Sequence, residues 1–251
     1  MTFRIRHLAL CLSLLPLPAA AATTWDIATG VDYSVGKYGA ASDTSIISVP
    51  LALRVQMDQL RLEATLPYVW ERGPGNFADG VVVPGGSGAV TDHSGIGDTS
   101  LGAAWILHAD DASFWGIELA GNVKVPTADS ALGTGKADYG VSVNLNHNLT
   151  QSFMVFGSVG YQWLNDFRTF HLEDGVAASV GVNQKLGADT DIGVSLAYRQ
   201  RYYAALDEQL AISPYVLFTV APRWRISAYA SAGFTNASPS AGGGMRVIFA
   251  P

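Results

Sequence analysis

The sequence predicts an all-β fold, a transmembrane antiparallel β-barrel of about twelve strands in an up-and-down meander. Apolar and polar residues alternate with period two along most of the chain, the pattern of strands with one apolar face. Only 14% of residues are charged, against roughly 25% in soluble domains. Beyond the N-terminal segment, no stretch approaches the roughly 18 consecutive apolar residues of a membrane helix. Because backbone polar groups must pair internally in lipid, strands of this kind can cross only as a closed barrel.

Residues 1–22 have the three parts of a secretory signal peptide. Arg4 and Arg6 precede an apolar run at 8–17, and a stretch of small residues ends at Ala22. We therefore expect export, cleavage after Ala22, and a single barrel domain over 23–251. Cys11, the one cysteine, would be lost with the leader, which leaves no disulfide or thiolate chemistry. The remaining 13 basic and 21 acidic residues give a net charge of −8, which disfavours nucleic acid as a partner.

The first three segments show the alternation most clearly. At 25–35, apolar side chains and Thr29 alternate with Asp26, Asp32 and small residues, and 47–56 and 60–71 repeat the pattern with Arg54, Arg61 and Glu63 on the polar face. A shift of register by one residue would move these charges to the apolar face, so the register is strongly specified. The pattern continues through nine more segments, at 96–108, 113–125, 138–149, 152–163, 176–186, 191–200, 210–220, 224–234 and 242–249.

The connections and the aromatic residues predict an orientation. Short breaks alternate with longer ones, as periplasmic turns alternate with external loops in outer-membrane barrels. Aromatic residues gather at strand ends, where amphipathic rings meet lipid headgroups. The expected periplasmic girdle is Trp25, Trp105, Trp115, Phe153, Phe218, Trp224 and Phe249. The expected external girdle is Tyr33, Tyr68, Trp70, Tyr139, Tyr161, Trp163, Tyr198 and Phe234.

The polar face of each segment should point into the lumen. The candidate pore-lining residues carry both signs of charge, which argues against a pore tuned for one ion sign. Twelve strands enclose a narrow interior, which long side chains should partly block. The candidates are Arg54, Arg61, Glu63, Asp98, Glu118, Lys124, Asp138, Arg199 and Arg225.

No enzyme, metal or cofactor site is legible. The histidines His93, His108, His147 and His171 fall on separate segments without ligand spacing, and no Ser–His pair can be identified. We therefore expect no catalytic residues, no metal and no cofactor. The expected partners are outer-membrane lipids and small apolar solutes. The oligomeric state stays open, as do the pore radius, the gating and the role of the loop at 72–95.

Two short stretches resemble a family of outer-membrane barrels assigned to transport in the phenol-degradation meta-cleavage pathway. The first is G-I-G-D-T at 95–99, which opens the fourth segment. The second is K-V-P-T at 124–127 with G-T-G-K-A-D-Y-G at 133–140, where Ala128 replaces the glycine usual after Pro-Thr. The resemblance implies passage of small hydrophobic or aromatic compounds through the outer membrane of a Gram-negative cell.

Asp98, Lys124 and Asp138 should meet near the external end of the lumen. One interpretation makes them a gate or constriction. The other, which we favour, makes them structural ion pairs, for instance Lys124 with Asp138, because buried charges in a narrow barrel must be paired. We expect Gly95, Gly97, 133 and 135 to permit sharp turns rather than to contact a ligand.

The function that follows is an outer-membrane channel for small, hydrophobic or aromatic molecules. Two alternatives stay open. An outer-membrane lipid hydrolase would need a Ser–His pair with an orienting acid at the lipid-facing rim. An occluded structural or adhesive barrel would use long loops such as 72–95, with the valines at 81–83 as a partial plug.

Overall fold

The computed structural model describes residues 23–74, 76–78, 81–83, 90–109, 115–129, 131–166 and 171–251. The expected signal peptide, 1–22, lies outside the described residues, and its cleavage stays a prediction. The same holds for the side chains of the valines at 81–83.

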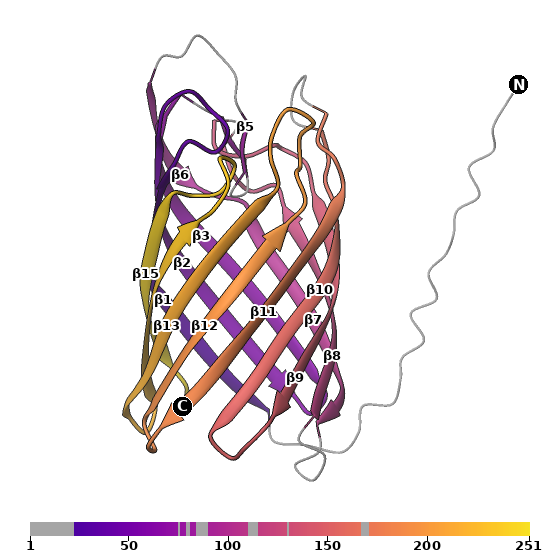
Figure 1. Ribbon diagram of the computed structural model, residues 1–251, viewed down its shortest axis with the longest axis vertical. Coiled ribbons are helices and arrows are strands. Elements are labelled where there is room, and N and C mark those ends of the chain that lie inside the picture. Colours follow the sequence, from indigo (N-terminus) through magenta and orange to yellow (C-terminus); the bar gives the residue numbers. More distant parts are fainter. Residues whose placement is uncertain are drawn as a thin grey trace, which may run out of the picture.

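Antiparallel strands close into one barrel (Figure 1). Within the barrel sheet the first strand pairs with the last, which completes the ring. The strands are β1 (Thr24–Gly36), β2 (Thr44–Met57), β3 (Leu60–Gly73), β4 (Asn76–Ala78), β5 (Val81–Val83), β6 (Thr91–Ile96), β7 (Thr99–Ala109), β8 (Trp115–Val125), β9 (Asp138–Asn148), β10 (Phe153–Trp163), β11 (Gly175–Leu186), β12 (Thr190–Arg199), β13 (Gln209–Ala221), β14 (Trp224–Gly233) and β15 (Ala241–Phe249).

Of the 13 strands in the barrel sheet, β6 and β7 share one position, so the barrel has the twelve predicted. The C-terminal part of β3, 68–73, pairs with β6, and its N-terminal part, 60–65, pairs with β7. The fourth predicted segment therefore begins at Thr91 rather than at 96, and the expected loop 72–95 is shortened from both ends. The short strands β4 and β5 pair only with each other.

The predicted asymmetry of the connections is present. Tight turns join β2 to β3, β11 to β12 and β13 to β14 at one end of the barrel, and the longer loops stand at the other (Figure 1). Asp58 and Gly187 adopt positive φ angles of 51° and 76° in two of these turns. The C-terminus lies at the end with the short turns.

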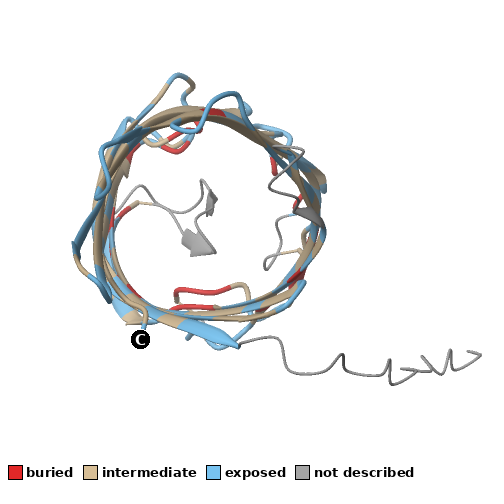
Figure 2. Cartoon of the chain, turned by 90° about the horizontal axis from the view of Figure 1, so that it is seen from below, coloured by how far each residue is buried: buried red, intermediate tan, exposed pale blue. Residues whose placement is uncertain are grey.

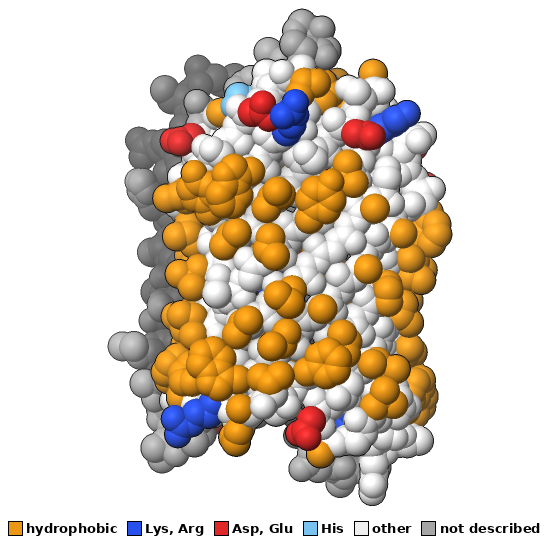
Figure 3. Space-filling model, turned by 90° about the vertical axis from the view of Figure 1, so that its left-hand side faces the viewer, with side chains coloured by type: hydrophobic (Ala, Val, Ile, Leu, Met, Phe, Trp, Pro, Cys, Tyr) orange, Lys and Arg blue, Asp and Glu red, His pale blue; other side chains and the backbone are white. Residues whose placement is uncertain are grey.

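The outer wall is apolar and banded. Outward-facing side chains such as Leu51 and Val180 are 50% and 58% exposed, as suits contact with lipid tails rather than with a protein core. Figure 3 shows apolar side chains in two belts across this wall, with charged side chains above and below them. Rings touch within both predicted girdles, as in Tyr68–Trp70 at 4.5 Å and Trp224–Phe249 at 4.8 Å between centroids. No helix of the described residues is long and apolar enough to span a membrane.

The barrel is filled unevenly. Seen down its axis it forms a ring, and buried parts of the external loops lie on the ring's inner side (Figure 2). Two small apolar clusters hold these loops in place. One joins Tyr38, Ile46, Val69 and Leu132, and the other joins Leu172, Tyr202, Leu206 and Ala237. The first cluster joins the loops that follow β1 and β8, and the second joins the loops that follow β10, β12 and β14. Both groups of loops narrow the external mouth of the barrel (Figure 2).

Candidate functional site

Eight of the nine predicted pore-lining side chains stand at inward-facing strand positions, and Asp98 lies in the break between β6 and β7. Residues opposite each other in neighbouring strands share a face, and Arg54 lies opposite Glu63 just as Lys124 lies opposite Asp138. Apolar residues between these positions face lipid. The structure thus brings seven of the nine into two clusters and places Arg199 and Arg225 apart from both. Asp98 joins the second cluster from the break between β6 and β7.

The first cluster lies toward the end with the short turns. Glu63 forms ion pairs with Arg54 at 3.0 Å and with Arg61 at 2.9 Å. Arg61 continues to Glu118 at 2.6 Å, and Asn144 donates to the same carboxylate at 2.7 Å. The chain of contacts links β2, β3, β8 and β9 across the inner face of β7.

These charges border open space within the barrel. The side chains of Arg54 and Glu63 face inward, yet they are 51% and 41% exposed. Ion pairs this exposed contribute no more than about 1 kcal/mol each. Their main effect is therefore to give this half of the lumen a polar, solvated wall.

The second cluster is buried. Lys124 Nζ lies 2.6 Å from Asp138 Oδ2 and 3.3 Å from Asp98 Oδ2, and it donates to Thr134 Oγ1 at 2.9 Å. The Lys124 and Asp98 side chains are each 2% exposed and that of Asp138 is 7% exposed. The ion pair expected between Lys124 and Asp138 is therefore present, and it links the neighbouring strands β8 and β9.

The same carboxylates hold two external loops. Asp98 Oδ1 accepts a hydrogen bond from the Ala128 amide at 3.0 Å, in the 126–137 loop. Asp138 Oδ1 accepts one from the Asn165 amide at 2.7 Å, in the loop after β10. The cluster is covered by the loops that it holds. Its geometry therefore agrees with the interpretation of these three residues as structural ion pairs. A role of these three residues in lining or gating a pore stays a prediction.

Close packing explains most of the motif glycines. Gly135 alone among Gly95, Gly97, Gly133 and Gly135 has a positive φ, of 70°. A Cβ on Gly133 would lie 2.9 Å from Asp98 Oδ1, and one on Gly97 would lie 2.9 Å from Pro67 Cγ. The expectation of sharp turns thus holds at Gly135, while Gly133 and Gly97 let backbone approach the buried cluster and β3.

Arg199 and Arg225 occupy opposite ends of the wall formed by β10 to β15. Arg199 ends β12 near the external loops, and its guanidinium carbon lies 5.4 Å from the centre of the Tyr202 ring. Arg225 follows the start of β14, opposite Ile248 of β15. Neither belongs to the two clusters above.

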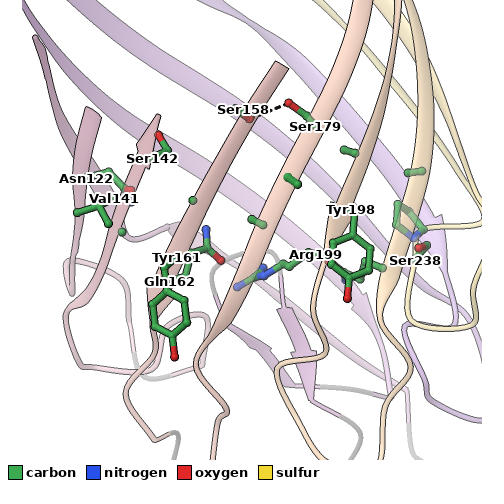
Figure 4. Close-up of a pocket in the computed structure, with 18 residues that line it drawn as sticks. Asn122, Val141, Ser142, Ser158, Tyr161, Gln162, Ser179, Tyr198, Arg199 and Ser238 are labelled. Carbon is green, nitrogen blue, oxygen red and sulfur yellow. Dashed lines mark hydrogen bonds between the residues drawn. The ribbon is translucent and has the colours of Figure 1, made fainter. Parts of the chain in front are cut away.

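Sequence reasoning missed a cavity of about 400 Å³ against β9 to β13 (Figure 4). Small inward-facing residues create it, since Ala177, Ala197 and Ala211 stand where long side chains would fill the lumen. Ser158 and Ser179 join across β10 and β11 at 2.8 Å and add a hydroxyl-lined patch. The signal for it was available, because small residues recur with period two on the polar faces of these strands.

The described residues contain no group of three His, Cys, Asp or Glu side chains that could hold a metal ion. His147 stacks on Trp115 at 4.1 Å, and His171 pairs with Asp166 at 2.8 Å in an external loop.

Solved structures with similar folds are outer-membrane proteins. The COG4313 outer membrane channel from Pseudomonas putida F1 matches with a TM-score of 0.66 at 15% identity, over 94% of this chain and 98% of that chain. The KdgM porin matches with a TM-score of 0.60 at 9% identity, over 89% and 98%. The CymD monoaromatic hydrocarbon channel matches with a TM-score of 0.50 at 12% identity, over 90% and 87%. At these identities the likeness establishes the fold.

A search of curated proteins found none that matches the chain. A family model, described as "Putative MetA-pathway of phenol degradation", matches residues 29–250 and so covers nearly the whole barrel. This agrees with the resemblance carried by the motifs at 95–99 and 124–140. The chain therefore belongs to this phenol-degradation family of β-barrel proteins.

Proposed function

We propose that this chain is an outer-membrane channel through which small hydrophobic or aromatic molecules pass. The observation that carries the proposal is a closed barrel with an apolar outer wall and a cavity of about 400 Å³ on its inner face. A volume of this order is typical of sites for small ligands. Export through a cleaved signal peptide at 1–22 belongs to the same proposal, as do outer-membrane lipids as the surrounding partner.

The interior supports passage because it is polar near the short turns and lined by small residues at the cavity. Ala197 faces the lumen and is exposed there, so the wall is not filled by side chains at this point. The half-exposed Arg54 and Glu63 mark solvated space nearer the short turns. A solute with an apolar body would find its best contacts along the small residues of β10 to β13.

The family description and one structural neighbour suggest the same class of solute. The family is described by phenol degradation, and CymD is named a monoaromatic hydrocarbon channel. An aromatic ring fits a wall of alanine, glycine and serine, because such a wall offers a flat surface with few protruding groups.

A channel also accounts for the arrangement better than an outer-membrane lipid hydrolase. Such an enzyme would place a serine and a histidine together on the lipid-facing rim. At that rim His147 stacks on Trp115, and the Ser158–Ser179 pair lies on the inward face. We therefore propose a non-enzymatic role.

Narrowing the cavity tests the channel directly. Ala197→Phe places a ring in the lumen, whereas Leu196→Phe places one on the lipid face of the same strand, where Leu196 is 39% exposed. The purified full chain would be reconstituted in planar bilayers, and uptake of labelled phenol would be followed in cells carrying each variant. We expect Ala197→Phe to lower conductance and uptake and Leu196→Phe to leave both unchanged. A wild-type barrel that conducts no ions and speeds no uptake would instead favour the occluded barrel.

A further inference from the structure

Three aromatic side chains of the barrel strands face the lumen. Phe156 of β10 stands two residues from Ser158, which lines the cavity, so both side chains point inward (Figure 4). Tyr215 of β13 shares the face of Ala211, another cavity residue, and it lies opposite Tyr229 of β14. The other aromatic side chains of the described barrel strands stand on lipid-facing positions and form the two girdles.

Each of the three rings lies over a glycine of a neighbouring strand. A side chain added at any of these glycines would overlap the ring. The pairs are Phe156 with Gly181, Tyr215 with Gly193, and Tyr229 with Gly244. The glycines therefore let the rings lie against the backbone of β11, β12 and β15. All three side chains are partly exposed, so each ring keeps a surface toward the lumen.

Hydrogen bonds hold the two tyrosine rings in place. The Tyr215 hydroxyl donates to Asn183 Oδ1 at 3.0 Å. The Tyr229 hydroxyl donates to Asp32 Oδ1 at 2.8 Å, and the other oxygen of Asp32 accepts from Arg246 Nη2 at 3.0 Å. Both hydroxyl protons are thus engaged within the barrel wall. The surface that these tyrosines present to the lumen is therefore mainly that of the ring.

The rings continue the inner wall from the cavity toward the short turns. Inward residues form rows across neighbouring strands, and the row at the cavity contains Ser179 and Ala197. The next row toward the short turns contains Phe156, and the row after it contains Tyr215 and Tyr229. Successive rows are two residues apart, or about 7 Å along a strand. A solute that leaves the cavity in this direction meets an aromatic surface at each step.

We propose that Phe156, Tyr215 and Tyr229 form an inner aromatic surface on which uncharged aromatic molecules stack as they move from the cavity toward the short turns. Contact between two aromatic rings stabilises a complex beyond the area that it buries. A saturated ring of the same size gains only the effect of the buried area. The inference rests on the proposed function, and it adds the residues that select an aromatic solute over an aliphatic one.

Phenol and cyclohexanol test the selection, because they share a six-membered ring and one hydroxyl and differ in aromaticity. Isothermal titration calorimetry on the full chain in detergent would measure the binding of each. We expect phenol to bind more tightly to the wild type. Phe156→Leu and Tyr215→Leu should each weaken phenol binding about two- to ten-fold, the contribution of one aromatic contact. Each should weaken cyclohexanol binding by a smaller factor.

Two further variants are matched controls. Tyr215→Phe keeps the ring and should keep the preference for phenol. Phe218→Leu removes a ring from the lipid face of the same strand, where Phe218 is 42% exposed, and it should leave both affinities unchanged. Electrophoretic mobility before and after heating would verify that each variant forms a folded barrel.

Two results of the calorimetry would overturn the inner aromatic surface. One is a wild type that binds phenol and cyclohexanol equally. The other is a preference for phenol that persists in Phe156→Leu and Tyr215→Leu, or that Phe218→Leu lowers as much as they do. Rings that only fill the space above the glycines would give this second result, because their loss would change stability and not the preference.

Planar-bilayer recordings separate this inference from the channel itself. Ion current that phenol reduces at lower concentration than cyclohexanol in the wild type, but not in Tyr215→Leu, supports both. Ion current that the two compounds reduce equally overturns the inner aromatic surface and leaves the channel intact. A preference for phenol in calorimetry without any ion current removes the channel function and supports the aromatic surface alone.

Discussion

Lys124→Met would remove the cation of the buried cluster while keeping a side chain of similar length. Lys124 Nζ contacts two carboxylates, at 2.6 Å on Asp138 and 3.3 Å on Asp98, and none of the three side chains is more than 7% exposed. Without the lysine, both carboxylates stay in a region that excludes water. Removing one partner of a buried ion pair costs about 3–5 kcal/mol.

The structure places this variant toward the lower part of that range. Asp98 keeps its hydrogen bond from the Ala128 amide, and Asp138 keeps the one from Asn165, so neither carboxylate is stripped of all donors. We therefore expect a loss of about 3 kcal/mol in the free energy of unfolding. Arg72→Met is the control, because Arg72 and Asp92 are 3.8 Å apart and 70% exposed, and such a pair contributes at most about 1 kcal/mol.

Urea unfolding in lipid vesicles, followed by tryptophan fluorescence, would measure both variants. A second test adds Asp98→Asn and Asp138→Asn to Lys124→Met. These changes remove the uncompensated charges, so they should recover much of the lost stability if charge burial is the cause. Burial of uncompensated charge is not the cause if Lys124→Met costs no more than Arg72→Met, or if the added asparagines recover none of the lost stability.

Two further predictions concern the wall and an external loop. Leu51→Arg should lower the free energy of unfolding by about 2–4 kcal/mol in the same urea experiment, because Leu51 is 50% exposed on the lipid face. Ala52→Arg is the control, and it should cost clearly less because residue 52 faces the lumen. Equal costs for the two variants would contradict the assigned faces. Burial raises the pKa of Tyr38 above its ordinary value of 10.0, so its stabilising contribution is complete below pH 10 and is lost as the pH rises through the raised value. Tyr38→Phe should therefore lose less stability than the wild type above pH 10, and an unchanged alkaline profile would show that Tyr38 ionisation is not responsible.

The sequence could predict the barrel because each strand repeats a two-residue period, and twelve repeats reinforce one another. It could not place the start of the fourth strand. Residues 91–96 lack a clean apolar face, since Asp92 faces outward and is 70% exposed beyond the apolar belt. The G-I-G-D-T motif therefore resembled a strand start, although it is a break within one strand position. Gly97 there donates its amide to the Pro67 carbonyl at 2.8 Å.

The sequence predicted the charged residues of the lumen, but it did not predict the cavity. Long polar residues such as Arg54 and Arg61 stand out in a sequence, and they suggested a narrow, partly blocked interior. The cavity depends instead on small residues, and their recurrence with period two on the polar faces indicates a space only once the register of the neighbouring strands is known. Ala177, Ala197 and Ala211 come together only through the register of β11, β12 and β13.

The positive and negative residues of the lumen are separated in the barrel, which the sequence alone did not show. A mixed lining argues against selection by sign when the charges are interspersed. Here the acidic residues lie mainly along β1 to β9, while Arg199 and Arg225 belong to the arc from β10 to β15. The two arcs adjoin where Arg246 of β15 pairs with Asp32 of β1 at 3.0 Å, so opposite charges meet at their border. The charge of the lumen is therefore close to balanced overall, but it is unevenly distributed around the ring.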